Sequence, residues 1–125
     1  MTIREAINRA DTIRPNQYTD EIKIQWLSEL DERIFNDIIS THEDNPYIDT
    51  IDENGNTVKG IVFPYTDDSV SLIASSPYDV LYSSYLVAMI DEANEETTRY
   101  TNSSIKYNVQ YQDYAKWYNR NHLHI

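Results

Sequence analysis

The sequence of 125 residues contains no cysteine, which excludes disulfide bonds, thiol catalysis and thiolate metal sites. Only two glycines are present, too few for a glycine-rich phosphate-binding loop, and the GxSxG, P-loop and GxGxxG motifs are absent. The longest apolar run is far shorter than the roughly 20 residues that a bilayer span requires, and the first residues lack the apolar core of a signal peptide. We therefore expect a soluble protein that originates in the cytoplasm and has no membrane partner.

Basic residues are also scarce. Ten Lys and Arg residues stand against 21 Asp and Glu residues, which gives a net charge of −11. A protein with this balance repels duplex DNA and anionic membrane surfaces. We expect any double-stranded DNA near the protein to pass without specific binding.

The length fits a single domain over residues 1–125. Its aromatic content is unusual, because eleven tyrosines accompany only two phenylalanines. A tyrosine buries a large ring and keeps one polar tip, so it suits a protein interface as well as a core. Composition alone leaves both interpretations open.

The strongest helical pattern runs from Pro77 to Ala93. Ser76 is a suitable N-cap, Pro77 suits the first helical position, and Asp79 in the first turn opposes the helix dipole. Apolar residues occupy a broad face and also the opposite side of this segment, which holds Val80, Val87 and Ile90. We predict a helix over about 77–93 that is either central in the fold or shared with a partner.

Three further helices are predicted, over about 3–13, 20–41 and 95–119. Thr2 and Glu5 form a capping box before the first, and Thr19 precedes the second. The first two are predicted to form an αα-hairpin that packs on the 77–93 helix. The predicted fold class is mainly α, a four-helix bundle-like domain with a β-hairpin or loop excursion at about 45–74.

The last predicted helix carries a seam of aromatic and small residues at spacings of three and four. If the chain reverses near Asn94, this seam packs on the 77–93 helix; if it does not, one long helix exposes an aromatic stripe. We favour reversal. The seam consists of Tyr100, Ser104, Tyr107, Tyr111, Tyr114 and Tyr118.

Residues 43–76 form an acidic hairpin or loop insertion. Residues 41–76 carry a net charge of −6, and Lys59 is their single basic residue. The dipeptide Asn54-Gly55 predicts a type I′ turn between strands at about 47–51 and 57–63, and another short strand is expected at 70–74.

No chemical site is predicted. Residues 50–61 partly match a calcium-binding EF-hand loop, but Thr50 and Ile61 stand where that loop needs a carboxylate and a bidentate glutamate. The adjacent carboxylates at 67–68 and 95–96 are interpreted as solvated turn charges, so no paired acid and base is expected. We predict no catalytic residue, no metal, no cofactor and no enzymatic activity.

Seven residues are candidates for contact with a protein partner, and core packing is the alternative for each. We predict in particular that Val80 and Val87, one heptad apart, touch a neighbouring subunit. The full set is Val80, Val87, Ile90, Phe63, Tyr65, Trp117 and Tyr118.

Three segments carry a family resemblance: WLSELDERI at 26–34, PYDVLYSSYLVAMIDEANEETTRY at 77–100 and YAKWYNR at 114–120. The chain resembles the small head-tail connector, or head-completion adaptor, proteins of tailed phages and prophages of Gram-positive bacteria. The likeness covers roughly residues 1–44 and 70–122. Residues 45–69 depart from it, because they look longer and more hairpin-like than the compact acidic link expected there.

The resemblance implies a structural protein that forms a ring at the portal vertex, extends the DNA channel and docks the next head-completion or tail protein. Its partners would then be further copies of itself, which can stay monomeric before assembly, the portal protein and that next component. Such a protein is located in the host cytoplasm during assembly and in the virion neck afterwards.

The negative charge of the middle segment is compatible with this role, because carboxylates that line a conduit repel the phosphates of passing DNA. The acidic channel candidates are Asp49, Asp52, Glu53, Asp67 and Asp68. The alternative function is an acidic helical binding module, regulatory or DNA-mimic-like, that occupies a basic site on a protein partner.

Overall fold

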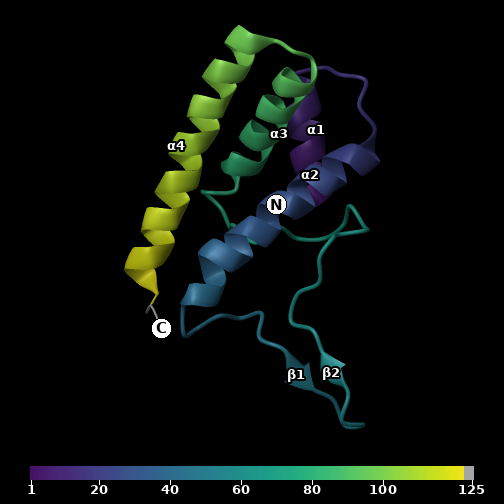
Figure 1. Ribbon diagram of the computed structural model, residues 1–125, viewed down its shortest axis with the longest axis vertical. Helices are drawn as coiled ribbons and strands as arrows, with labels where there is room; N and C mark the ends of the chain where they lie inside the picture. Colours follow the sequence, from purple (N-terminus) through teal and green to yellow (C-terminus); the bar gives the residue numbers. More distant parts are fainter. Residues whose placement is uncertain (123–125) are drawn as a thin grey trace.

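The computed structural model describes residues 1–122 and is mainly helical, as predicted. Four helices pack against one another, and a small antiparallel hairpin projects from one end (Figure 1). No helix within 1–122 is both long and apolar enough to cross a membrane. The elements are α1 (Ile3–Ile13), α2 (Asp20–Asp37), the 3-10 helix η1 (Ile39–Thr41), β1 (Thr50–Ile51), β2 (Thr57–Val58), α3 (Val80–Ala93) and α4 (Thr97–Asn121).

Helix α3 is the centre of the bundle. It contacts α1, α2 and α4, and in Figure 1 it lies between α4 on one side and α1 and α2 on the other. Leu81, Leu86 and Ile90 are fully buried, and Met89 is the one residue between 81 and 91 that is not buried. Apolar residues on both sides of this helix therefore reflect a central position in the fold.

The first two helices form the predicted hairpin on α3. The side chain of Thr2 accepts a hydrogen bond from the Glu5 amide at 3.2 Å, and the Glu5 carboxylate accepts one from the Thr2 amide, which confirms the capping box. Thr19 caps α2 through the Ile22 amide. The core-facing residues Ile3, Ile7, Leu27, Leu30 and Ile34 are all fully buried.

Helix α2 ends at Asp37, earlier than the predicted boundary at 41. The carbonyl of Ile38 accepts hydrogen bonds from the Thr41 hydroxyl at 2.7 Å and from the His42 ring nitrogen Nδ1 at 2.6 Å. The His42 amide bonds instead to the Ile39 carbonyl. Side-chain donors thus occupy the carbonyl that the next α-helical turn would use, and the chain tightens into η1.

The start of α3 is also corrected, from 77 to 80. Residues 75–79 form a turn in which the Tyr78 amide donates to the Ser75 carbonyl at 2.9 Å, and Asp79 is the N-cap without a side-chain capping bond. The ring of Tyr78 stacks on Trp117 with a centroid distance of 4.9 Å. Pro77 thus lies in the turn, outside the first helical position that the sequence predicts, and the Tyr78 ring links this turn to α4.

The chain reverses after α3, as favoured from the sequence, so α3 and α4 lie side by side (Figure 1). Helix α3 closes with paired bonds from the Glu95 amide to the Glu92 carbonyl and from the Glu96 amide to the Asp91 carbonyl, each 3.0 Å long. This is a Schellman motif, which requires a left-handed residue after the cap. Glu95 fills that position with φ of 59°.

Replacing Glu95 with glycine is expected to stabilise the protein. A side chain in the left-handed region costs about 1–2 kcal/mol, part of which glycine loses again through its greater freedom in the unfolded chain. We expect a net gain of up to about 1 kcal/mol in the free energy of unfolding, measured by urea denaturation. Glu96→Gly is the control, because Glu96 has an ordinary φ of −87° and its substitution should give no gain.

The tyrosine seam of α4 is confirmed for its carboxyl-terminal part. Tyr107, Tyr114 and Tyr118 are buried, and burial raises the pKa of all three phenols. Tyr111 is half-buried, whereas Tyr100 stays exposed near the start of the helix. The seam therefore packs on the bundle mainly between 107 and 118.

The hairpin is shorter than predicted, and its turn differs. The strands comprise only two residues each, with Thr50 opposite Val58 and Ile51 opposite Thr57. A type I′ turn needs a positive φ at both central residues, yet only Gly55 has one, at 78°. The Asp52 carboxylate instead accepts bonds from the Asn54 and Asn56 amides, both at 2.9 Å, and organises a five-residue loop.

The strand predicted at 70–74 is a single bridge. Thr2 pairs with Ser71, while the Ile3 amide bonds to the Val70 carbonyl and the Leu72 amide bonds to the Met1 carbonyl. Residues 70–72 thus lie along the chain that leads into α1.

Candidate assembly surface

The hairpin exposes apolar side chains outside the helical bundle. Ile51 is 75% exposed and Val58 is 46% exposed. Cross-strand partners share a face of a two-stranded ribbon, so the pairings place Ile51 on one face and Val58 on the other. Apolar β-branched residues on both faces, together with unpaired strand edges, are typical of a segment that packs against another protein.

The base of the hairpin is held by Asp49. Its carboxylate forms an ion pair with Lys59 at 3.2 Å and accepts a bond from the Gly60 amide at 3.1 Å, contacts that lower its pKa, the Gly60 bond most. Gly60 also lies against the backbone of Tyr47, where an added Cβ would come within 2.1 Å of the carbonyl oxygen. These contacts hold the two chains together where the hairpin begins.

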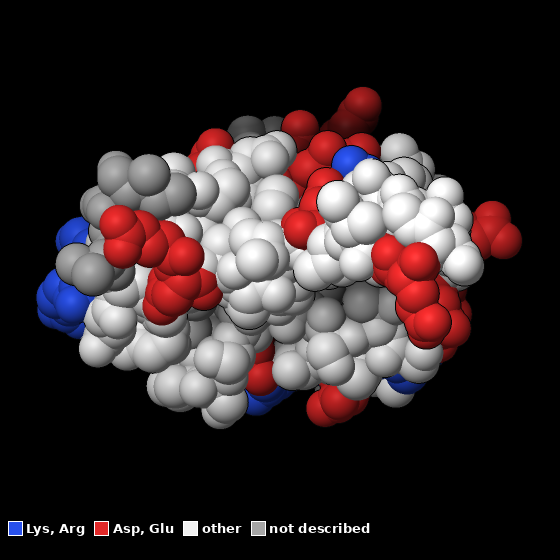
Figure 2. Space-filling model, turned by 90° about the horizontal axis from the view of Figure 1, so that it is seen from below, with Lys and Arg blue, Asp and Glu red and all other residues white. Residues whose placement is uncertain are grey.

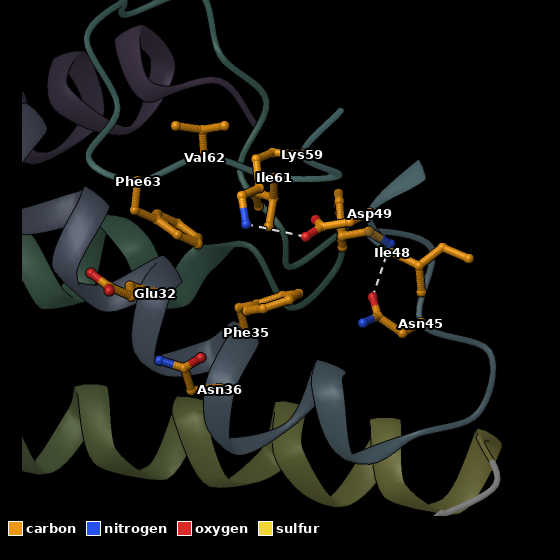
Figure 3. A pocket seen from close by; sticks show the side chains of 11 residues that line it. Glu32, Phe35, Asn36, Asn45, Ile48, Asp49, Lys59, Ile61, Val62 and Phe63 are labelled. Carbon is orange, nitrogen blue, oxygen red and sulfur yellow. Dashed lines mark hydrogen bonds and ion pairs between the residues drawn. The ribbon is translucent and has the colours of Figure 1, made fainter. Parts of the chain in front are cut away.

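A groove lies between α2 and the segment that leads to and from the hairpin. Two adjoining hollows of about 500 and 520 Å³ share Glu32 and together follow α2 from Glu21 to Asn36. In Figure 3, Phe35 of α2 and Phe63 of the returning chain point toward each other across one hollow. We call this the α2 groove; its other main lining residues are Ile24, Gln25, Ser28, Glu29, Tyr47, Ile48, Asp49, Lys59, Ile61, Val62, Pro64, Tyr65 and Thr66.

A buried carboxylate positions the wall of the α2 groove. Asp31 is fully buried and accepts hydrogen bonds from the Tyr82 hydroxyl at 2.6 Å, the Tyr65 hydroxyl at 2.7 Å and the Ile73 amide at 3.1 Å. The Tyr82 hydroxyl in turn accepts from the Ala74 amide at 2.7 Å. Asp31 therefore joins α2, α3 and the middle segment, and the loss of water around it raises its pKa despite these donors.

A second buried carboxylate joins three helices at the other end of the bundle. Asp91 of α3 is fully buried, forms an ion pair with Arg14 at 2.8 Å and accepts a hydrogen bond from the Ser103 hydroxyl at 2.9 Å. These contacts tie the end of α1 to α3 and α4. They stabilise the helical bundle that carries the α2 groove and the hairpin.

The seven candidate partner contacts are divided by the structure. Ile90 is fully buried and Val87 nearly so, which places both in the core, while Val80 is half-buried. Tyr118 is buried in the α4 seam, and Trp117 packs on Tyr78. The sequence predicts that Val80 and Val87 touch a neighbouring subunit. Val87 is not exposed enough to make such a contact.

The two remaining candidates, Phe63 and Tyr65, line the α2 groove. Tyr65 is also fixed internally, because its hydroxyl donates to Asp31 and its amide donates to the Ser28 hydroxyl at 2.9 Å. Phe63 is half-buried and packs on Phe35 with a centroid distance of 6.3 Å. Its ring is available as part of a contact surface.

The acidic candidates lie in two places. Asp49, Asp52 and Glu53 belong to the hairpin, whereas Asp68 pairs with Arg4 at 2.7 Å and Asp67 accepts a bond from the Ser69 amide. Figure 2, a view from the end where the hairpin projects, shows acidic side chains in several separate groups. The structure does not bring the five carboxylates together into one lining.

Sequence reasoning missed Asp31, the carboxylates along the α2 groove and the outward face of α4. A signal for Asp31 was present, because it falls at helical spacing among Leu27, Leu30 and Ile34 on the core side. Within residues 1–122, no group of three or more His, Asp or Glu side chains is arranged to hold a metal ion.

Comparisons with known proteins add no family to these observations. No protein-family model matches the chain, and neither curated proteins nor solved structures give a significant match. The surfaces described above and the resemblance in the sequence remain the features that point to a function.

Proposed function

We propose that this protein is a structural head-tail connector of a tailed phage or prophage. In this role it assembles with copies of itself as a ring at the portal vertex, extends the DNA channel and docks the next head-completion or tail protein. It is made in the host cytoplasm and ends in the virion neck. The resemblance of residues 1–44 and 70–122 to that family supports the proposal.

The observation that carries it is the projecting hairpin. Ile51 and Val58 expose apolar surface on both faces of a ribbon that is anchored at its base but extends beyond the helices (Figure 1). A segment of this kind stabilises little within its own chain, and it gains burial when it inserts between other subunits. The acidic loop at its tip, with Asp52 and Glu53, suits a position beside passing DNA, because like charges repel.

Deleting the gene tests the role itself. In a phage that encodes this protein, loss of the gene is expected to leave DNA-filled or emptied heads without tails in electron micrographs of lysates. Normal tailed particles from the deletion would reject the connector role. The alternative, an acidic binding module, predicts normal particles and a protein that competes with DNA for a basic partner.

Replacing Ile51 and Val58 with serine in the complementing gene tests the hairpin. Both side chains are exposed, so the free energy of unfolding is expected to change by less than about 0.5 kcal/mol. Tailed particles should fall at least tenfold, because the apolar contacts with neighbouring proteins are lost. Thr50→Ser and Thr57→Ser on the same strands form the control, and full complementation by the Ile51/Val58 variant would contradict the role given to the hairpin.

A further inference from the structure

The outward face of α4 carries an exposed apolar pair. The buried tyrosines of α4 face α3, and Ile105 and Val109, four residues apart, lie on the opposite side of the helix. They are 58% and 56% exposed. The same side carries Lys116 and Arg120 farther along the helix, and both side chains are exposed.

Helix α4 is positively charged although the whole protein is acidic. Four of the ten basic residues lie on it, and Asp113 is its single acidic residue, so α4 carries a net charge of +3. Within residues 1–122 none of the four forms an ion pair. Figure 2 shows blue atoms gathered at the left, the side on which α4 lies in Figure 1. The four are Arg99, Lys106, Lys116 and Arg120.

The α2 groove has the opposite charge. Helix α2 carries a net charge of −4, and Glu21, Glu29 and Glu32 line the groove without an ion-pair partner among the described residues. Between these carboxylates the lining is mixed, with Gln25, Ser28 and Thr66 beside Ile24, Pro64 and Tyr65, and it is most apolar at the end that holds Phe35 and Phe63. The groove thus offers apolar contacts with an acidic rim, and α4 offers an apolar pair with basic neighbours.

The two surfaces also match in length. The groove follows α2 from Glu21 to Asn36, and the outward face of α4 runs from Ile105 to Arg120. Each stretch spans fifteen residue steps, about 22 Å at the rise of an α-helix. A helix that lies along the groove would bring Lys116 and Arg120 near carboxylates at one part of the contact and Ile105 and Val109 near apolar side chains at another.

We propose that the outward face of α4 from one copy of this chain binds in the α2 groove of a second copy. Ile105 and Val109 pack on the apolar side chains of the groove, while Lys116 and Arg120 approach the unpaired glutamates. Since the two surfaces are different, each copy keeps one of each kind free and the contact repeats from copy to copy, closing into a ring where the rotation allows. This inference deepens the proposed connector role and rests on it for its biological setting.

Cross-linking tests the contact directly, because the native chain has no cysteine and so gives no background. One variant carries Val109→Cys on α4, and two others carry Gln25→Cys or Asn36→Cys in the groove; a short bismaleimide joins nearby thiols. When the α4 variant is mixed with a groove variant at high protein concentration, mixed dimers are expected to outnumber same-variant dimers several-fold. Asn8→Cys, on the exposed side of α1, replaces the groove cysteine as the control.

Three results would overturn the contact. Mixed dimers at the level of the Asn8 control would show that α4 does not reach the groove, as expected if the groove takes a basic segment of another protein instead. Dominant Val109 to Val109 dimers would show a symmetric contact between two α4 helices. Equal cross-linking to all sites would show non-specific association.

Charge exchange gives a second readout that a merely unfolded variant would not reproduce. The double variant Glu29→Lys, Glu32→Lys reverses the charge of the groove and should abolish its cross-linking to an α4 of native charge. The double variant Lys116→Glu, Arg120→Glu reverses the charge of α4 and should abolish its cross-linking to a groove of native charge. Pairing the reversed groove with the reversed α4 should restore the mixed dimers. No restoration from two folded variants would count against the charge complementarity.

The outcome is separable from the proposed function. Mixed dimers together with normal tailed particles from the gene deletion would keep the contact and reject the connector role. Tailless heads from the gene deletion, together with an absence of mixed dimers, would keep the connector role and reject the contact.

Discussion

Asp31→Ala is expected to lower the free energy of unfolding by about 3–5 kcal/mol, one of the two largest effects of a single substitution that we anticipate. The alanine leaves the hydroxyls of Tyr82 and Tyr65 and the amide of Ile73 without the acceptor that they now share. Tyr82 is fully buried, so its hydroxyl cannot turn to water. Urea denaturation followed by far-UV circular dichroism measures the loss.

The comparison with Asp31→Asn separates charge from hydrogen bonding. Burial raises the pKa of Asp31 above its ordinary value of 3.8, so the folded protein takes up this proton at a higher pH than the unfolded chain. The stability gained in this way is fully present below the unfolded pKa and is lost as pH rises through the folded pKa. Asparagine does not titrate in this range.

The stability of the wild type relative to Asp31→Asn should therefore fall as pH increases from below 4 toward neutrality. A difference that stays constant over this interval would show that the carboxyl is not held in the environment described. An Asp31→Ala variant as stable as Tyr65→Phe, which removes only one of the three hydrogen bonds, would contradict the shared-acceptor role.

Arg14→Ala is the second substitution with a large expected effect, a loss of about 3 kcal/mol in the free energy of unfolding. It removes the cation that lies 2.8 Å from the fully buried carboxylate of Asp91, whose remaining side-chain partner is the hydroxyl of Ser103. The cost comes mainly from leaving a charge buried without its counter-ion. Thermal and urea unfolding of the purified variant measure it.

A double-mutant cycle provides the control for this pair. If the ion pair is responsible, Arg14→Ala combined with Asp91→Ala should be less destabilising than the sum of the two single substitutions. Additive losses would show that Arg14 stabilises the end of α1 through packing alone.

Much of the fold could be predicted because local signals and tertiary packing agree. The Thr2 and Glu5 capping box fixes the start of α1, and the apolar residues on both sides of α3 require a central helix. The reversal after α3 was also predictable in position. Its mechanism was not, because a Schellman motif usually has glycine where this chain has Glu95.

The boundary of α3 that failed depends on a contact with a distant residue, whereas the predicted hairpin turn failed because of a nearby side chain. Ser76 and Pro77 are suitable for a helix start, but Tyr78 stacks on Trp117, nearly forty positions along the chain, and the helix begins later. The Asn54-Gly55 pair signals a tight turn, but the Asp52 side chain caps a wider loop. Local propensity carries no information about the contact with Trp117, and the dipeptide signal alone leaves out the competing Asp52 carboxylate two residues before Asn54.

The candidate surface was predictable only in part. The acidic hairpin and Phe63 were identified from the sequence, whereas the α2 groove depends on long-range contacts that hold the middle segment against α2, among them the hydrogen bonds to Asp31 and Ser28. Ile105 and Val109 had a signal in the sequence, since they are four residues apart on the side of α4 opposite the tyrosines. Their significance depends on the reversal, which turns that side outward.

The stacking of Trp117 on Tyr78 provides an intrinsic optical reporter. The protein has only two tryptophans, and Trp26 lies elsewhere, edge-on to Tyr18. In a Trp26→Phe protein the tryptophan emission, excited at wavelengths that tyrosine does not absorb, comes from Trp117 alone, and it follows the contact between the carboxyl-terminal part of α4 and the turn before α3. Spectral change that precedes the loss of helicity during denaturation would reveal a stage in which this end of α4 has separated while the remaining helices are still folded.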